Sequence, residues 1–210
     1  MEQINFIFEH GKGCSGKDTQ AHLIHEHLGE NAIELSTGDI FRSATKGVGE
    51  YSRFKNIFDP YIEEVNIRGG LISDKPIVEV VKIIVAEQIE KGVTNFIFTG
   101  FPRTVVQLDL VDETLKELNA ESIHIFFDVS DDEIRERAAR RFENAIRKGE
   151  DPRPEDKPNV VEDRLKTYRD NTYPMILKLD QENRLIKING EGTIPEVGEE
   201  VSRRLFKERQ

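Results

Sequence analysis

The residues that mark secreted, zinc-binding and membrane-spanning proteins are scarce in this sequence. Cys14 is the only cysteine among 210 residues, which excludes an internal disulfide and a zinc site built from cysteines. No apolar run approaches the roughly 20 residues that cross a membrane. The first residues are not basic and the apolar run after them is short, so no signal peptide is expected. These absences predict a soluble, cytoplasmic protein with no membrane partner.

Positive charge is also in deficit. The formal net charge at pH 7 is −10, which argues against a nucleic acid as partner, because the two would repel. Many of the positive residues gather in one stretch: Arg135, Arg137, Arg140, Arg141, Arg147, Lys148 and Arg153. They either bind a small, highly charged ligand or form a solvated helix face paired with the glutamates between them. Charge alone leaves both interpretations open.

Five short apolar segments alternate with helical patterns. They are residues 4–8, 32–35, 95–98, 122–129 and 185–188. The alternation predicts an α/β fold, with a five-stranded parallel sheet flanked by helices on both faces. Helices are predicted over residues 21–28, 75–90, 131–142 and 160–179. Asp74 and Thr193 are expected to cap helices, and Ser130 to form a capping box with Glu133. Residues 43–70 predict a helical insertion, and the charged, Gly- and Pro-rich residues 144–158 predict a mobile surface segment.

The stretch between the first strand and the first helix fits the pattern Gly-x-x-x-x-Gly-Lys, with Gly11, Gly16 and Lys17. Glycines let backbone N–H groups approach an anion closely, and the helix N-terminus and the lysine add positive charge. We therefore interpret this stretch as a phosphate-binding P-loop. In many P-loops a Ser or Thr hydroxyl directly after the lysine ligates Mg²⁺. Here that position holds Asp18, and Thr19 comes one residue later.

Three histidines, His22, His25 and His27, lie on the first predicted helix. A metal site would need their rings to converge. His22 and His25 are three residues apart, but His27 points elsewhere, and no further Cys or His motif supports a site. The sequence therefore predicts surface histidines and no zinc.

Two further motifs follow predicted strands, at the edge where α/β sheets bind ligands. Thr37-Gly38-Asp39, with Arg42 after it, follows the second strand and either binds a ligand or caps a helix. Gly100-Phe101-Pro102-Arg103 follows the third strand and holds Arg103 at a tight turn. That guanidinium either binds phosphate oxygens in bidentate fashion or pairs with a carboxylate.

In this order the motifs resemble those of the adenylate kinases, within the nucleoside monophosphate kinases, and the resemblance covers nearly the whole chain. The P-loop is similar to the family's ATP loop, and Leu35-Ser36-Thr37-Gly38-Asp39 with Arg42 is similar to its AMP-site motif. Gly70-Leu71-Ile72 resembles the strip whose backbone contacts the AMP base and ribose. Gly100-Phe101-Pro102-Arg103 with Gln107 resembles the Gly-Phe-Pro-Arg signature and its adenine-reading glutamine.

The arginines also keep the spacing of the family. Arg137 and Arg141 stand at the entrance of the family's lid. Arg153-Pro154-Glu155-Asp156 resembles the Arg-x-Asp-Asp motif at its exit, and Arg164 follows at the family's distance. The resemblance therefore favours the first interpretation of the positively charged stretch, in which its arginines bind phosphate groups, over a solvated helix face.

The resemblance implies a P-loop NTPase fold in a single kinase domain, residues 1–210. The core would comprise residues 1–42, 71–141 and 159–210. Residues 43–70 would form an inserted monophosphate-binding lobe, and residues 142–158 a short lid without zinc. The implied ligands are ATP, AMP and ADP with Mg²⁺, and the protein is expected to be a monomer.

The implied reaction is reversible transfer of a phosphoryl group from MgATP to AMP, giving two ADP. The acceptor phosphate is already largely ionised at neutral pH, so catalysis would depend on positioning and on neutralising charge. The implied catalytic residues are Lys17, Arg103, Arg141, Arg153 and Arg164. The implied ATP contacts are Gly11, Gly13, Cys14, Ser15, Gly16, Lys17, Asp18, Thr19, Arg137, Arg141 and Ile194. The implied AMP contacts are Thr37, Gly38, Arg42, Gly70, Leu71, Ile72, Gly100, Phe101, Arg103, Gln107, Arg153 and Arg164.

The sequence departs from the family around the metal. The family usually has Asp before Gly-Phe-Pro-Arg, where it orients water on Mg²⁺, and Gly after the P-loop lysine. Here these positions hold Thr99 and Asp18. We hypothesise that Asp18 replaces the missing carboxylate and holds Mg²⁺ together with Thr19. The alternative is that Asp18 only caps the helix.

Two other functions remain open at this point. One is phosphorylation of UMP, CMP or another nucleoside monophosphate, although Thr37 and Gln107 favour adenine. The other is a nucleotide sensor without catalysis, which Thr99 makes conceivable. The full set of phosphate-facing arginines argues against a sensor, because simple binding does not need charges that meet only at a transition state.

Overall fold

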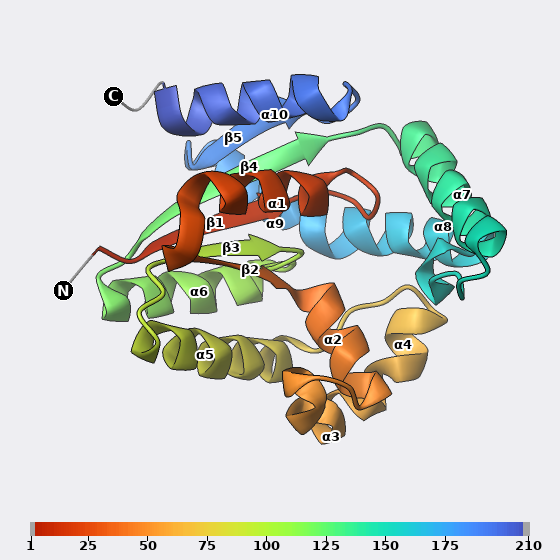
Figure 1. The fold of residues 1–210 in the computed structure, drawn as a ribbon, viewed down its shortest axis with the longest axis horizontal. Helices are drawn as coiled ribbons and strands as arrows, with labels where there is room; N and C mark the ends of the chain where they lie inside the picture. Colours follow the sequence, from red (N-terminus) through yellow and green to blue (C-terminus); the bar gives the residue numbers. More distant parts are fainter. Residues whose placement is uncertain (1–2, 208–210) are drawn as a thin grey trace.

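A parallel sheet of five strands forms the centre of the molecule. The computed structural model describes residues 3–207, and within them the strands pair in the order β2-β3-β1-β4-β5 (Figure 1). They are β1 (Asn5–His10), β2 (Ala32–Ser36), β3 (Asn95–Thr99), β4 (Glu121–Asp128) and β5 (Leu185–Asn189). Each strand overlaps a predicted apolar segment, so the predicted parallel sheet is confirmed.

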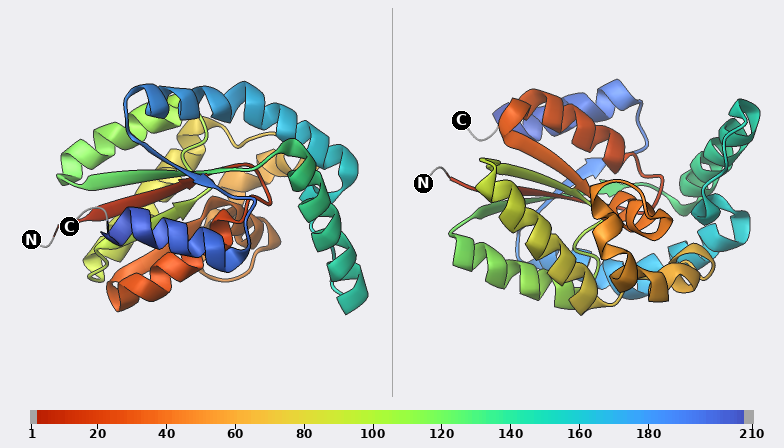
Figure 2. Two further views of the ribbon diagram at one scale, coloured as in Figure 1. Left: turned by 90° about the horizontal axis from the view of Figure 1, so that it is seen from above. Right: turned by 60° about the horizontal axis from the view of Figure 1, so that its bottom comes forward.

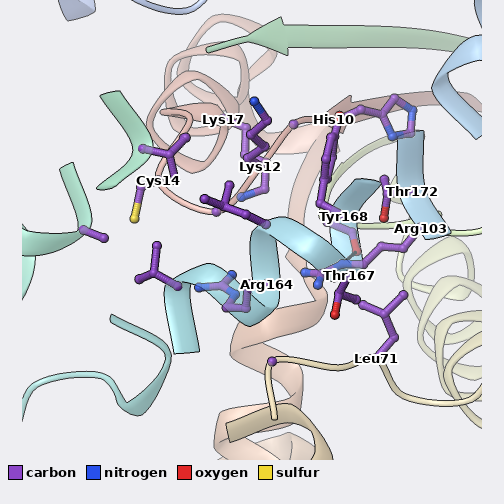
Figure 3. A pocket seen from close by; sticks show the side chains of 18 of the residues that line it. His10, Lys12, Cys14, Lys17, Leu71, Arg103, Arg164, Thr167, Tyr168 and Thr172 are labelled. Carbon is purple, nitrogen blue, oxygen red and sulfur yellow. Dashed lines mark hydrogen bonds between the residues drawn. The ribbon is translucent and has the colours of Figure 1, made fainter. Parts of the chain in front are cut away.

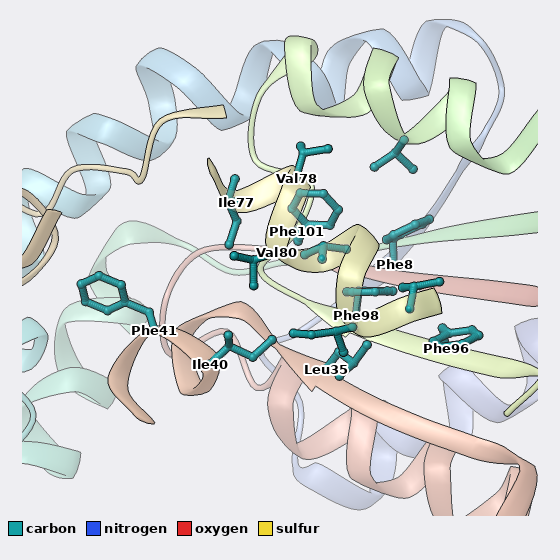
Figure 4. Packing of buried hydrophobic residues seen from close by; sticks show 14 of the residues in the cluster. Phe8, Leu35, Ile40, Phe41, Ile77, Val78, Val80, Phe96, Phe98 and Phe101 are labelled. Atoms are coloured by element: carbon teal, nitrogen blue, oxygen red, sulfur yellow. The ribbon is translucent and has the colours of Figure 1, made fainter. Parts of the chain in front are cut away.

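Helices cover both faces of this sheet, which is why its strands are apolar on both sides. On one face lie α1 (Lys17–Leu28) and α10 (Ile194–Ser202), and on the other α5 (Asp74–Glu90), α6 (Val105–Leu118) and α9 (Tyr173–Gln181) (Figure 1). Alternate residues of β1 enter the two cores. Ile7 packs with α1, whereas Phe8 joins the aromatic and aliphatic core beneath α5 and α6 (Figure 4). The two packed layers hold the strand ends in place.

The remaining helices follow the carboxyl ends of β2 and β4. After β2 come α2 (Thr37–Lys46), η2 (Glu50–Phe54), α3 (Lys55–Phe58), η3 (Asp59–Tyr61) and α4 (Ile62–Asn66). After β4 come α7 (Asp131–Lys148), which projects from the body of the molecule (Figure 2), then η4 (Pro154–Asp156) and α8 (Pro158–Thr167). Short turns η1 (Gly29–Asn31) and η6 (Arg203–Lys207) follow α1 and α10. Within residues 3–207, no helix is both long enough and apolar enough to cross a membrane.

Two predicted helices differ from the observed ones. The helix predicted over residues 131–142 continues to Lys148 and ends at Gly149, whose φ is 70°. Its apolar rhythm stops early because the helix leaves the core and enters solvent, so part of the segment predicted to be mobile is helical. The helix predicted over residues 160–179 is divided by the π-helical turn η5 (Tyr168–Thr172). Pro174 follows this turn, and its missing N–H prevents regular α-helical bonding there.

The predicted helix caps are confirmed at two positions and wrong at one. Ser130 accepts a bond from the Glu133 N–H at 3.3 Å, but the capping box predicted there is incomplete, because the Ser130 N–H donates to Glu191. Thr193 forms a full capping box with Glu196. Asp74, however, is the first helical residue of α5 and not its cap. Its carboxylate instead accepts bonds from Thr104 Oγ1 at 2.8 Å and Gln107 Nε2 at 2.9 Å, which tie α5 to the start of α6.

Candidate functional site

The loop between β1 and α1 has the geometry of an anion-binding turn. Its backbone is left-handed at Cys14, with φ of 65°, and at Gly16, with φ of 92°. A Cβ at Gly11 would lie 2.7 Å from Ser15 Oγ, so the turn leaves no room for a side chain there. The loop leads directly into α1 at Lys17. The free N–H groups of this helix start are therefore available to a phosphate.

Two pockets meet beside the loop. The first encloses about 700 Å³ of space and the second about 650 Å³, open solvent at their mouths included. The first is lined on one side by the P-loop, including Lys17, and on the other by α8 (Figure 3). The second lies at the ends of β2 and β3. Both are lined by Leu71, Gly100, Arg103 and Arg164, so the pockets share a wall.

The predicted nucleotide contacts divide between these pockets. Every predicted AMP contact except Arg153 lines the second pocket: Thr37, Gly38, Arg42, Gly70, Leu71, Ile72, Gly100, Phe101, Arg103, Gln107 and Arg164. Of the predicted ATP contacts, Gly11, Gly13, Cys14 and Lys17 line the first pocket. The others lie outside its wall: Ser15, Gly16, Asp18, Thr19, Arg137, Arg141 and Ile194.

Positive charges converge at the shared wall. Burial lowers the pKa of Arg103 to about 10, and repulsion by Arg164 and Arg42 acts in the same direction. Arg103 is oriented by its Nε, which donates to the Gly100 carbonyl at 2.6 Å. A phosphate placed here would relieve the repulsion among the three guanidinium groups.

Two of the predicted phosphate-binding arginines are held by carboxylates of η4. Arg42 donates to Glu155 Oε1 at 2.7 Å and to Asp39 Oδ1 at 2.6 Å. Arg141 forms a bidentate pair with Asp156, at 2.6 and 2.5 Å. Glu155 and Asp156 are both buried. These carboxylates bond the same guanidinium N–H groups that a phosphate would use.

Three of the predicted contacts outside the pocket walls are Arg137, Ile194 and Arg153. Arg137 donates to the Gly190 carbonyl at 2.9 Å and to Glu133 Oε1 at 2.6 Å. Ile194 is exposed, at the first position of α10. Arg153 is exposed, and its positive charge is one of the causes that lower the pKa of Asp18. Their contacts with nucleotide stay predictions.

Gln107 lines the second pocket, but its amide is largely engaged by the protein. Its Oε1 accepts a bond from the Arg103 N–H at 2.7 Å, and its Nε2 donates to Asp74 at 2.9 Å. One N–H of the amide is left for a ligand. Its first role is therefore to hold the Gly-Phe-Pro-Arg turn, and reading of adenine stays a prediction.

Asp18 and Thr99 lie together next to the P-loop lysine. Partial burial of the Asp18 carboxyl would by itself raise its pKa, but Lys17 and the Thr99 hydroxyl lower it to about 2. Lys17 Nζ lies 3.3 Å from Asp18 Oδ2. The Thr99 hydroxyl is buried and makes no hydrogen bond of ordinary geometry. An ionised carboxylate beside an unsatisfied hydroxyl can accommodate a hydrated divalent cation.

The sequence reasoning missed a buried carboxylate beneath this site. Glu9 lies in β1, opposite Thr99 of β3, and is fully buried with no hydrogen-bond partner for either oxygen. Burial raises the pKa of Glu9 well above its usual value, although the positive charge of Lys17 acts against the shift. The predicted strand ended at Phe8, so Glu9 was placed outside it. A glutamate between an apolar run and a P-loop is the signal that would have found it.

A second missed cluster lies on α1 and β2. Glu34 Oε1 is 3.0 Å from His22 Nδ1 and 3.2 Å from His25 Nδ1. His27 lies apart, stacked on Phe206 at 4.1 Å between ring centroids. The third group comes from a strand, so a search for Cys and His on the helix could not find it.

Known proteins of one family resemble this chain over most of its length. The model of the family described as adenylate kinase matches residues 10–184. An adenylate kinase of Hyphomonas neptunium is 33% identical over 91% of this chain and 93% of its own length. Those of Thermosipho melanesiensis and Leptospira biflexa are 32% and 33% identical, each over 94% of this chain and 97% and 96% of their own lengths.

Proposed function

The chain belongs to the adenylate kinase family, and we propose that it transfers a phosphoryl group reversibly from MgATP to AMP, giving two ADP. The observation that carries this proposal is the wall of Arg103 and Arg164 between two pockets. Transfer between two nucleotides needs one centre that both reach. In this proposal the P-loop pocket takes ATP, and the pocket lined by Thr37 and Arg42 takes AMP.

The cations would act by neutralising charge, with no general base. Lys17 holds the β and γ phosphates of ATP, while Arg103 and Arg164 contact the transferred group from the wall. A metaphosphate-like transition state spreads charge over three oxygens, so fixed guanidinium groups stabilise it more than the separated reactants. The AMP phosphate needs no base to ionise it, since its second pKa is about 6.

Arg141, Arg153 and Arg42 would join this centre when the lid closes. We propose residues 142–158 as the lid and residues 43–70 as the monophosphate-binding lobe. The lid segment carries Glu155 and Asp156, which now hold Arg42 and Arg141. Arriving phosphates would share or take over these guanidinium groups, which couples binding to movement of the segment. Closure would also exclude water and so limit hydrolysis of ATP.

Adenylate kinases use ATP as its magnesium complex, and the residues at the P-loop fit such an ion. Asp18 is ionised at neutral pH because its pKa is about 2, and its side chain is 55% exposed. We propose that Asp18 and Thr19 hold Mg²⁺ or its water ligands, with Asp18 replacing the carboxylate absent at Thr99. When bound, the ion adds positive charge at the β and γ phosphates.

The Asp18 proposal is tested by Asp18→Gly. We expect the variant to need at least about tenfold more free Mg²⁺ for half-maximal rate, in line with the cost of losing an outer-shell metal partner. The measurement is the rate against free Mg²⁺ at fixed ATP and AMP. An unchanged magnesium profile would mean that Asp18 only shapes the start of the helix.

The function itself is tested by a coupled assay with ATP as donor and AMP, UMP, CMP or GMP as acceptor. We expect AMP to be preferred. Preference for UMP or CMP would instead indicate a different nucleoside monophosphate kinase, and binding without turnover of any acceptor would indicate a sensor. We further propose a monomer without nucleic-acid or membrane partners, acting in the cytoplasm. Light scattering on the purified protein tests the monomeric state.

A further inference from the structure

The cluster of His22, His25 and Glu34 lies outside both nucleotide pockets. It joins α1, which lies on one face of the sheet, to the edge strand β2 beside it (Figure 1). The His and carboxylate ligand atoms all lie within 4.8 Å of one another. We propose that these three residues bind a divalent transition-metal ion of the zinc type.

The two distances from the carboxylate oxygen to the imidazole nitrogens match those around a shared metal. A tetrahedral ion with ligands at about 2.0–2.1 Å places those ligands about 3.3 Å apart. Glu34 Oε1 lies 3.0 Å from His22 Nδ1 and 3.2 Å from His25 Nδ1. The carboxylate oxygen is thus already at the right distance from both rings, and a small movement would admit the ion.

An acceptor lies behind the outer nitrogen of each ring, and that of His25 is within hydrogen-bond distance. His25 Nε2 lies 3.1 Å from the Ala32 carbonyl oxygen, to which it can only donate. In the neutral ring, this contact places the proton on Nε2 and leaves the Nδ1 lone pair for a metal. His22 Nε2 lies 3.6 Å from Glu26 Oε1. The carbonyl behind His25 is the kind of acceptor that holds a metal-bound histidine in orientation, whereas the His22–Glu26 contact is too long for a hydrogen bond.

The ligand set selects the class of metal. Two imidazole nitrogens and one carboxylate oxygen favour Zn²⁺, Co²⁺, Ni²⁺ or Cu²⁺ over Mg²⁺, which prefers oxygen alone. The site would therefore fill in the presence of excess Mg²⁺, without competing for the ion at the P-loop. Its side chains are 62%, 36% and 31% exposed for His22, His25 and Glu34, so a water molecule can occupy the fourth position.

The position of the site gives the metal a structural effect. α1 begins at Lys17, and β2 leads into α2 at Thr37. A metal clamp would tie together the two elements that carry the P-loop lysine and the threonine of the second pocket. Binding to the folded state alone raises the unfolding temperature.

The test uses the full chain without an affinity tag, freed of metal and titrated with Zn²⁺ in excess Mg²⁺ by calorimetry. We expect one Zn²⁺ per chain and a rise in unfolding temperature. His22→Gln, His25→Gln and Glu34→Gln should each weaken binding at least about tenfold. His27→Gln is the matched control, since it removes a histidine from the same helix but outside the cluster.

The Zn²⁺ affinities of these variants either support or overturn the proposed site. Loss of affinity in the three ligand variants, with His27→Gln unchanged, supports the site. Equal Zn²⁺ affinity in all the variants would place the ion elsewhere and overturn it, as would a lack of Zn²⁺ binding by the unaltered chain. Circular dichroism checks that each variant is folded. If a histidine variant folds poorly, the Zn²⁺ affinity of Glu34→Gln still tests the site. The proposal does not depend on kinase activity.

Discussion

Glu9 is the residue whose environment conflicts most with its chemistry. A carboxylate buried without a hydrogen bond costs about 1–3 kcal/mol or more, and Glu9 has no hydrogen-bond partner. Its pKa is raised in the folded state by burial, so the folded chain holds the proton more tightly than the unfolded chain. Stability is therefore present at low pH and is lost as pH rises from the unfolded pKa through the raised folded pKa.

Glu9→Gln removes the charge but keeps the shape. We expect the variant to unfold at a higher temperature than the unaltered chain. The difference between the two unfolding temperatures should grow as pH rises from about 4.5 upward. Thermal unfolding of both proteins across pH 4–8 measures it. Glu121→Gln, at an exposed strand position, serves as control. A difference between Glu9→Gln and the unaltered chain that is constant with pH would contradict the explanation.

Arg164 is the residue that most directly links the two pockets. Its guanidinium lies so close to the P-loop that a Cβ on Gly13 would approach it to 2.6 Å. We expect Arg164→Met to reduce kcat by about 10³-fold, because a cation at the transferred group is lost. Lys166→Met on the same helix removes an exposed charge instead and should change kcat little. A similar kcat for both variants would remove Arg164 from the transition state.

At the scale of elements, an ion pair between half-exposed Arg141 and buried Asp156 joins α7 to η4. Asp156 is 1% exposed and Arg141 36%, so Asp156→Asn leaves a guanidinium without its counter-ion. We expect a loss of about 1–3 kcal/mol in the free energy of unfolding, measured in urea. Asp132→Asn breaks an exposed pair with Arg135 on the same helix and should have no measurable effect. Equal effects would mean that the Asp156 pair is screened by water.

At the scale of the whole molecule, the proposed lobe and lid should move against a rigid core. We expect hydrogen exchange to slow in residues 43–70 and 142–158 when a bisubstrate analogue that links two adenosines binds. The strands of the sheet should change little, because their amides are already protected by the ladder. Exchange mass spectrometry measures this. Uniform slowing across the chain would indicate general stabilisation and no closure.

The sequence by itself determined the strands, the P-loop and the order of the motifs. These are patterns of neighbouring residues: apolar runs, glycines before a lysine, an arginine after Gly-Phe-Pro. It also identified the family and nearly all of the second pocket, because the motifs sit at strand ends and parallel strand ends meet. The end of helix α7 was predicted too early, at Phe142. The periodicity of apolar residues shows which part of a helix is buried, and it stops where α7 leaves the core although the helix continues.

Only the tertiary structure decided which distant side chains meet. Glu34 reaches the two histidines because β2 lies beside α1. Glu9 lies opposite Thr99 because of the register between β1 and β3. Arg103 and Arg164 form one wall because the turn after β3 and helix α8 converge on the P-loop. Register and packing are set by the whole chain at once, so no local pattern of residues contains them.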